Sequence, residues 1–245
     1  MADVEDVEDE ERSQPLPAVG GTITRIAPQR DAGRVSIYLD GRFIFGLNAT
    51  ISEEHGLRVG QSLSAADVTV LREREELNRA VDKALAFLTS RPRSIREVRD
   101  RLKEKEIPPD TIDAVVTRLE GWGYVGDEGF ARYWIENRGA NQPRGKRLLR
   151  QELWRKGVER GTVDQVLDEM EVDEAGGALA LARKRFNQLS GYDEQTQRRR
   201  LAAFLQRRGY DWPTVKGALD TLFAETEGGD EGEPLGDSDS YEYKG

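Results

Sequence analysis

The sequence has no cysteine, a single histidine and no long apolar segment. Without cysteine the chain cannot form disulfides, thiolate nucleophiles, iron–sulfur clusters or cysteine-bound zinc, which is typical of a protein of the reducing cytoplasm. Because His55 is the one histidine, a histidine-rich metal site is excluded as well. The mean hydropathy is -0.70, and no apolar stretch approaches the roughly 20 residues of a membrane helix. The N-terminus also lacks a secretory signal pattern, so we expect a cytoplasmic protein.

Motifs of catalytic and nucleotide-binding sites are equally scarce. Residues Gly121–Gly126 spell the dinucleotide pattern G-x-G-x-x-G, but they follow a helical pattern and not the strand that such a site requires. We interpret them as the turn that ends a helix, with Trp122 and Tyr124 packed below it. Residues 145–147 lack the spacing of a phosphate-binding loop, and no nucleophile adjoins His55. We therefore predict no enzyme, no cofactor and no metal.

The net charge of -9 is unevenly distributed. Residues 1–18 hold seven acids against one arginine, and residues 225–245 hold eight acids against one lysine, so the body between them is mildly basic. Neither tail shows apolar periodicity, and we predict that both acidic tails are disordered. Such tails act either in simple solubility or as a pseudo-DNA segment that folds back on the basic body.

Residues 19–63 read as a small β-rich subdomain. Alternating apolar residues predict strands at 22–26, 35–39 and 43–47, and in the last one Phe43, Phe45 and Leu47 share a face. Asp40-Gly41 is a strong signal for a two-residue hairpin turn. A sheet this small must pack on the helical part of the chain to be stable. A capping-box pattern at Thr50–Glu53 predicts a short helix that ends at Gly56.

From Ser64 onward the pattern is helical, with helix caps predicted at Ser64 and, by a capping-box pattern, at Ser94. One apolar skeleton occurs three times in this part of the chain. Its members are separated by the same offsets in each copy, and the copies lie 51 and 52 residues apart. The last four members of each copy are spaced as one stripe of an α-helix. The three sets are Leu102, Ile107, Ile112, Val115, Val116 and Leu119; Leu153, Val158, Val163, Val166, Leu167 and Met170; and Leu205, Tyr210, Val215, Ala218, Leu219 and Leu222.

Each copy is long enough for three helices. The predicted helices span 72–89, 94–105 and 110–122 in the first repeat, 127–139, 144–156 and 160–170 in the second, and 173–189, 194–208 and 212–224 in the third. The sequence therefore predicts a mainly α protein of three tandem three-helix repeats that form an elongated body, with a three-strand N-terminal addition. The predicted boundaries are 1–18, 19–63, 64–125, 126–172, 173–224 and 225–245.

Two motifs within these repeats resemble those of a known family. Residues Tyr124–Ala131 are similar to its aromatic–aliphatic–x–Asp–x–x–Phe–Ala motif, and Gly145–Val158 are similar to its Gly…Ile-x-x-Glu-Leu-x-x-Lys-Gly-Ile motif. From about Ala80 to Phe223 the chain thus resembles RecX, the bacterial modulator of the RecA recombinase. The strand region and the tails lie outside this resemblance.

The resemblance implies a regulator that inhibits RecA. A RecX protein binds the RecA–DNA filament in its helical groove and limits filament growth, strand exchange, ATPase activity and coprotease activity. Its partner would be the RecA filament, with single- or double-stranded DNA as a further ligand, and no membrane. We expect the chain to act as a monomer.

Two basic clusters, at residues 138–160 and 183–208, are the candidate contact surfaces. Each has a net charge of +6, and arginine, which predominates, suits contacts with phosphate or carboxylate. Leu149 and Leu153 occupy the inward stripe of their helix, so the charges should project outward. The predicted partner-binding residues are Arg144, Lys146, Arg147, Arg150, Arg198, Arg199 and Arg200.

Two other functions stay open from the sequence. The chain could be a helical-repeat DNA-binding protein without a recombinase partner, in which case its affinity would fall steeply with salt. It could also be a scaffold for another protein, with its basic faces paired to its own acidic tails.

Overall fold

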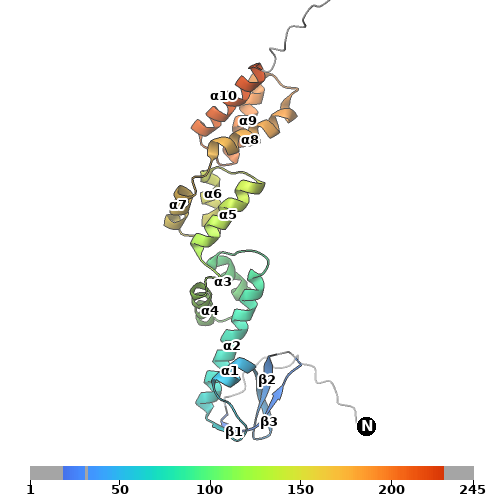
Figure 1. Ribbon diagram of the computed structural model, residues 1–245, viewed down its shortest axis with the longest axis vertical. Coiled ribbons are helices and arrows are strands. Elements are labelled where there is room, and N and C mark those ends of the chain that lie inside the picture. The colour runs from blue at the N-terminus through green and yellow to red at the C-terminus, as the bar shows by residue number, and fades with distance from the viewer. Residues whose placement is uncertain (1–18, 31–32, 229–245) are drawn as a thin grey trace, which may run out of the picture. The chain divides into compact units, whose positions relative to one another are not determined.

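The computed structural model describes residues 19–30 and 33–228, so the predicted tail at 1–18 and most of the one at 225–245 lie outside the described residues (Figure 1). The described chain is mostly helical, with a small antiparallel sheet at its start, which confirms the predicted fold class. It divides into two compact units. One comprises the residues up to Thr89 together with 101–119, and the other comprises 90–100 together with the residues from Glu120 onward.

The sheet of the first unit has one strand more than predicted. Its strands are β1 (Gly21–Pro28), β2 (Arg34–Leu39), β3 (Arg42–Asn48) and β4 (Ser62–Leu63), in the order β3-β2-β1-β4. The two-residue β4 is too short to show alternation, so its sequence carries no strand signal. The predicted turn is confirmed, since Asp40 and Gly41 both have positive φ (48° and 82°).

One face of the sheet is buried against helices. Ile37, Leu39 and Leu47 form a core with Val68 and Leu71 of the long helix α2 (Ala65–Leu88). The short helix α1 (Ala49–Glu54) follows β3 directly. The capping box predicted at Thr50 is wrong, because Asn48 is the N-cap and accepts a hydrogen bond from the Thr50 amide.

A buried carboxylate ties α2 to the sheet. Glu75 accepts hydrogen bonds from the Asn48 amide (2.8 Å) and Arg79 (3.0 Å), and it forms an ion pair with Arg34 at 2.7 Å. Three donors compensate for the cost of burying this charge. The predicted cap of α2 is confirmed, since Ser64 and Asp67 form a reciprocal capping box.

The predicted face of β3 is wrong at Phe43, which is 42% exposed. The pairing of β3 with β2 shifts between Ile37 and Tyr38, so Ile44 is an extra residue in the strand. A β-bulge of this kind reverses the alternation of side chains beyond it. Phe43 therefore lies on the face opposite to Phe45.

The remaining helices form the three-helix repeats, and those of one repeat lie side by side in the second and third (Figure 1). Nearly all members of the repeated skeleton are buried, the partly exposed ones being Ile107 and Met170. The helices are α3 (Ile95–Glu104), α4 (Pro109–Gly121), α5 (Asp127–Asn141), α6 (Lys146–Arg155), α7 (Arg160–Glu169), α8 (Glu174–Phe186), the 3-10 turn η1 (Asn187–Leu189), α9 (Glu194–Arg207) and α10 (Trp212–Gly228).

The middle helix of each repeat ends in the same way. Glu106, Gly157 and Gly209 occupy equivalent positions and all have positive φ (57°, 89° and 92°). The next residue then donates its amide to the carbonyl five residues back, as Val158 does to Leu153. Glycine favours this left-handed cap, and the first repeat makes it with glutamate.

Trp122 and Tyr124, predicted to pack below their turn, are instead 53% and 60% exposed. Their rings contact each other edge to face, with centroids 6.2 Å apart. The predicted packing is therefore wrong.

Candidate partner interface

The second and third repeats meet through the backbone at the start of α6. The amide of Gly145 donates to the carbonyl of Arg208 (3.0 Å), and the amide of Lys146 donates to the carboxylate of Glu174 (2.8 Å). A Cβ on Gly145 would lie 2.5 Å from the amide nitrogen of Tyr210. This residue must therefore be glycine for the two backbones to approach so closely.

The start of α3 makes an equivalent contact with the end of α6. The hydroxyl of Ser94 donates to the carbonyl of Lys156 at 2.6 Å. Ser94 precedes Gly145 by 51 residues and Lys156 precedes Arg208 by 52, the same spacing as in the apolar skeleton. The repeat therefore includes the contacts between modules as well as the core of each module.

Glu97 is the ionic centre of this contact. It lies 2.6 Å from Lys156 and 2.9 Å from Arg91, and it accepts from the Ser94 amide at 3.2 Å. Burial alone would raise the pKa of Glu97, but the hydrogen bonds from Arg91, Lys156 and Ser94 and the charge of Arg91 outweigh it and hold the pKa at about 2.

Replacing Glu97 by glutamine should lower the free energy of unfolding at neutral pH by about 1–3 kcal/mol, the cost of losing charge-assisted hydrogen bonds. Because the folded-state pKa is depressed, this stabilisation is present above the ordinary value of 4.5 and is lost as the pH falls toward 2. Urea unfolding over this range should show a smaller loss for E97Q than for the wild type. Equal pH slopes would contradict this assignment, and E104Q, at an exposed pair with Arg101, is the control.

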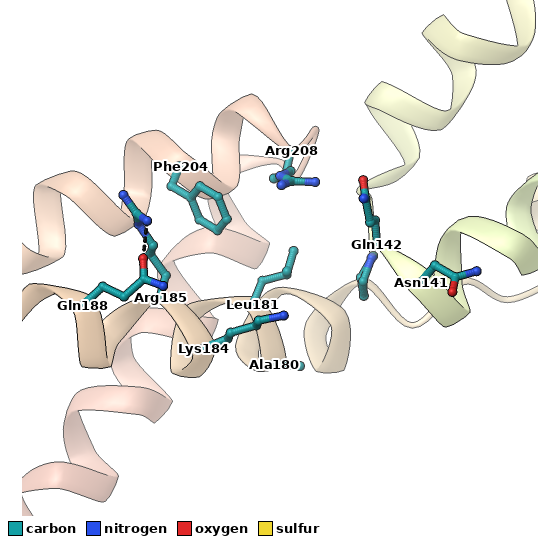
Figure 2. Close-up of a pocket in the computed structure, with 10 residues that line it drawn as sticks. Asn141, Gln142, Ala180, Leu181, Lys184, Arg185, Gln188, Phe204 and Arg208 are labelled. Carbon is teal, nitrogen blue, oxygen red and sulfur yellow. Dashed lines mark hydrogen bonds between the residues drawn. The ribbon is translucent and has the colours of Figure 1, made fainter.

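A basic groove of about 450 Å³ lies where the end of α5 meets α8 and α9 (Figure 2). Three of its lining side chains are cations, Lys184, Arg185 and Arg208, and none of the described residues that line it is acidic. Between them lies the ring of Phe204, with the guanidinium carbons of Arg208 and Arg185 at 5.4 and 5.9 Å from its centroid. The remaining lining residues are Asn141, Gln142, Pro143, Ala180, Leu181 and Gln188.

The structure places the residues predicted on α6 in different environments. Arg147 is exposed and donates to the carbonyl of Gln206 (2.6 Å), so it lies beside the end of α9. Lys146 is half-buried at the first turn of α6, and Arg150 forms an ion pair with Asp164 at 2.6 Å.

Arg144 does not project outward, so the predicted orientation is wrong for this residue. Its side chain is 17% exposed and forms an ion pair with Glu152. Burial, and then the nearby charges of Arg138 and Arg208, lower the pKa of Arg144. The carboxylate of Glu152 also accepts from Trp134, at 2.8 Å. Arg144 therefore makes its contacts within the second repeat and does not present its charge outward.

The three arginines predicted on α9 also differ from one another. Arg198 forms ion pairs with Glu194 (2.6 Å) and Asp220 (3.3 Å). Arg199 is exposed and has no ion-pair partner among the described residues. Arg200 is exposed, and its guanidinium lies 3.8 Å from the centroid of the Tyr192 ring.

Arg200 does not line the groove, but it shares a helix face with two residues that do. It precedes Phe204 by four residues and Arg208 by eight, which places all three on one face of α9. Lys184, Arg185 and Arg208 belong to the basic cluster at residues 183–208 but are not among the predicted partner-binding residues. The helical spacing between Arg200 and Arg208 is a sequence signal that could have predicted Arg208. The groove itself depends on how the repeats pack, which the sequence pattern does not show.

Metal-binding and membrane-spanning features have no support in the described chain. Within residues 19–30 and 33–228, no three His, Asp or Glu side chains lie close enough to hold a metal ion. No helix of the described chain has the length and apolar character needed to cross a membrane.

Family models match most of the chain. The model described as "Regulatory protein RecX N-terminal domain" matches residues 21–64. The models described as the first, second and third three-helix domains of RecX match residues 80–119, 127–167 and 173–219. The expectation that the strand region lies outside the family is therefore wrong.

Individual proteins agree with these matches. The chain is 30% identical over 207 residues to "Regulatory protein RecX" of Bacillus pumilus (strain SAFR-032), covering 82% of this chain and 77% of that one. It is 28% identical over 215 residues to the protein of the same name from Bacillus subtilis (strain 168), covering 87% and 81%. These relatives are named as regulatory proteins and not as enzymes.

Two solved structures share the fold. "Crystal structure of regulatory protein RecX" superimposes with a TM-score of 0.70 at 22% identity, covering 81% of this chain and 98% of that one. "Crystal structure of RecX from Lactobacillus salivarius" gives a TM-score of 0.57 at 18% identity, covering 62% and 99%.

Proposed function

The chain belongs to the RecX family, and on that premise we propose that it inhibits the RecA recombinase by binding the RecA–DNA filament in the cytoplasm. It acts as a monomer and without catalysis of its own. Bound to the filament, it limits filament growth and thereby strand exchange, ATP hydrolysis and coprotease activity.

The acid-free groove at the junction of the second and third repeats is the observation that supports this proposal best. Its lining holds Lys184, Arg185 and Arg208, and Arg147 on α6 and Arg200 on α9 are further exposed cations of these two repeats. A filament presents DNA phosphates and acidic protein side chains together, and both attract arginine and lysine. We propose that this set of cations contacts the filament, and that Arg144 and Arg150 support it from within the second repeat.

The mechanism is steric and electrostatic. A rigid basic surface that bridges neighbouring protomers occupies contacts which the filament needs in order to extend. The backbone contact between Gly145 and Arg208 keeps the two sides of the groove in a fixed relation. The surface is therefore preorganised, which lowers the entropic cost of binding.

Plain DNA binding is the second candidate, because a basic groove with an aromatic ring also fits a phosphate backbone. Co-sedimentation distinguishes the two. The chain should pellet with RecA assembled on single-stranded DNA with a slowly hydrolysed ATP analogue, and much less with RecA alone or DNA alone. Equal binding to bare DNA and to filaments would favour the DNA-binding function instead.

A further inference from the structure

Two β-bulges shape the outer face of the N-terminal sheet. Between β1 and β2 the pairing passes from Ile23↔Leu39 to Arg25↔Tyr38, and between β2 and β3 it passes from Ile37↔Phe45 to Tyr38↔Phe43. Each strand beside β2 thus contains one extra residue at this level. Regular alternation would direct Arg25 and Phe43 into the core, and the bulges direct them to the opposite face, where Tyr38 lies.

Arg25, Tyr38 and Phe43 form a row across three strands on this face. The Arg25 guanidinium carbon lies 4.0 Å from the centroid of the Tyr38 ring, and the Phe43 ring meets Tyr38 edge to face at 5.8 Å. Phe43 is 42% exposed, and Arg25 is exposed as well. The row therefore presents the planar guanidinium of Arg25, which is oriented by the Tyr38 ring, together with the exposed ring of Phe43.

The neighbouring row has small side chains. Ala27, Ser36 and Gly46 pair with one another across the same three strands. The Gln29 side chain lies over this row, because its Nε2 donates to the Ser36 hydroxyl at 3.1 Å and would lie 2.6 Å from a Cβ on Gly46. The accessible part of the face is therefore the aromatic row itself, at Phe43 and Arg25. Bulges that re-aim side chains are frequent next to functional sites, and here two of them produce one row.

The charge of this face is positive. Arg25 forms no ion pair with a carboxylate of the described residues. Asp40, the acid of the hairpin turn, accepts a hydrogen bond from the Thr22 amide at 3.1 Å. Neither row contains an acidic residue, so the face suits a flat and anionic ligand.

We propose that the outer face of this sheet binds single-stranded nucleic acid. Unpaired bases stack on Phe43 and on the guanidinium of Arg25, while a backbone phosphate contacts the charge of Arg25. Bases of single strands commonly stack on aromatic rings and arginine planes. A duplex should bind this face more weakly, because its bases are already stacked on one another. An acidic peptide should also bind more weakly, because it does not offer a row of flat bases to stack on Phe43 and Arg25. The site is separate from the basic groove and goes beyond the proposed function.

The test compares two fluorescein-labelled strands of equal length, an oligothymidylate and its abasic counterpart, which has the phosphates without the bases. Fluorescence anisotropy with the full chain should show clearly tighter binding of the oligothymidylate. Phe43→Ala should weaken that binding about 5- to 150-fold, the usual effect of losing one stacking ring, and should leave binding of the abasic strand nearly unchanged. Arg25→Lys keeps the positive charge but removes the planar guanidinium, so it should also weaken binding of the oligothymidylate.

The controls separate this site from the rest of the chain. Trp212→Ala removes a ring that is 56% exposed on α10 and should have no effect. The Phe43 effect should persist when Lys184 and Arg185 are both glutamate, so the result does not depend on the basic groove or on RecA. Since Phe43 lies outside the core, thermal unfolding should show an intact fold. Equal affinity for the two strands, or an unchanged affinity of the Phe43 variant, would overturn the proposal.

Discussion

Replacing both Lys184 and Arg185 by glutamate should abolish binding to the RecA filament while leaving the fold intact. The change converts a groove lined by three cations into one with a net negative charge. Like charges brought together at an interface cost several kcal/mol, so we expect the affinity to fall at least about 100-fold. Both side chains are exposed, and substitutions at such positions usually change stability by less than about 0.5 kcal/mol.

A matched control makes this result specific. Lys103 and Lys105 are exposed cations at the end of α3, and their replacement by glutamate changes the net charge by the same amount. This control variant should co-sediment with filaments almost as well as the wild type. If both double variants lose binding equally, net charge is responsible, and the groove is not the contact surface.

Gly145→Ala should markedly destabilise the packing of the second repeat on the third. The new Cβ would meet backbone atoms of Gly209 and Tyr210, and backbone cannot move aside as a flexible side chain can. Overpacking of this kind costs about 1–3 kcal/mol or more, and we expect the melting temperature to fall by at least about 2 °C.

Gly129→Ala is the matched control, because Gly129 lies within α5 and nothing lies within 4 Å of its added Cβ. Alanine is the better helix former by about 1 kcal/mol, so this variant should be slightly more stable than the wild type. If thermal unfolding shows that Gly145→Ala lowers the stability and Gly129→Ala raises it, the close backbone contact at Gly145 is established. A Gly145 variant with unchanged stability would show that the repeats do not pack in this way.

The fold was largely predictable because its signals are local. Ser64 and Ser94 cap their helices as predicted, and both form reciprocal capping boxes, with Asp67 and Glu97. The threefold apolar skeleton fixed the cores of the repeats, since burial depends on helical spacing. Glu106 was not predictable in the same way, because nothing local distinguishes a glutamate in a left-handed cap from one in a helix.

The candidate site was less predictable because it depends on pairing and packing between distant residues. A bulge opposite Tyr38 exposes Phe43, and no periodicity within one strand encodes which residue is the extra one. Arg144 and Arg147 look alike in sequence, yet Glu152 holds the first inside the repeat and the second reaches α9. The distribution of charge along the sequence predicts the basic regions. It does not predict the groove that Lys184 and Arg208 line, because the groove forms only when the repeats pack.

The DNA-dependent ATPase activity of RecA, measured with this protein at less than one copy per RecA, tests the central claim most directly. A ligand that sequesters DNA or RecA one for one cannot stop the reaction at such a ratio, whereas one that acts on filament ends or bridges protomers can. We predict strong inhibition by the wild-type chain and little by the variant with glutamate at positions 184 and 185. Undiminished ATP hydrolysis at this ratio would contradict the proposal that the chain regulates the RecA filament.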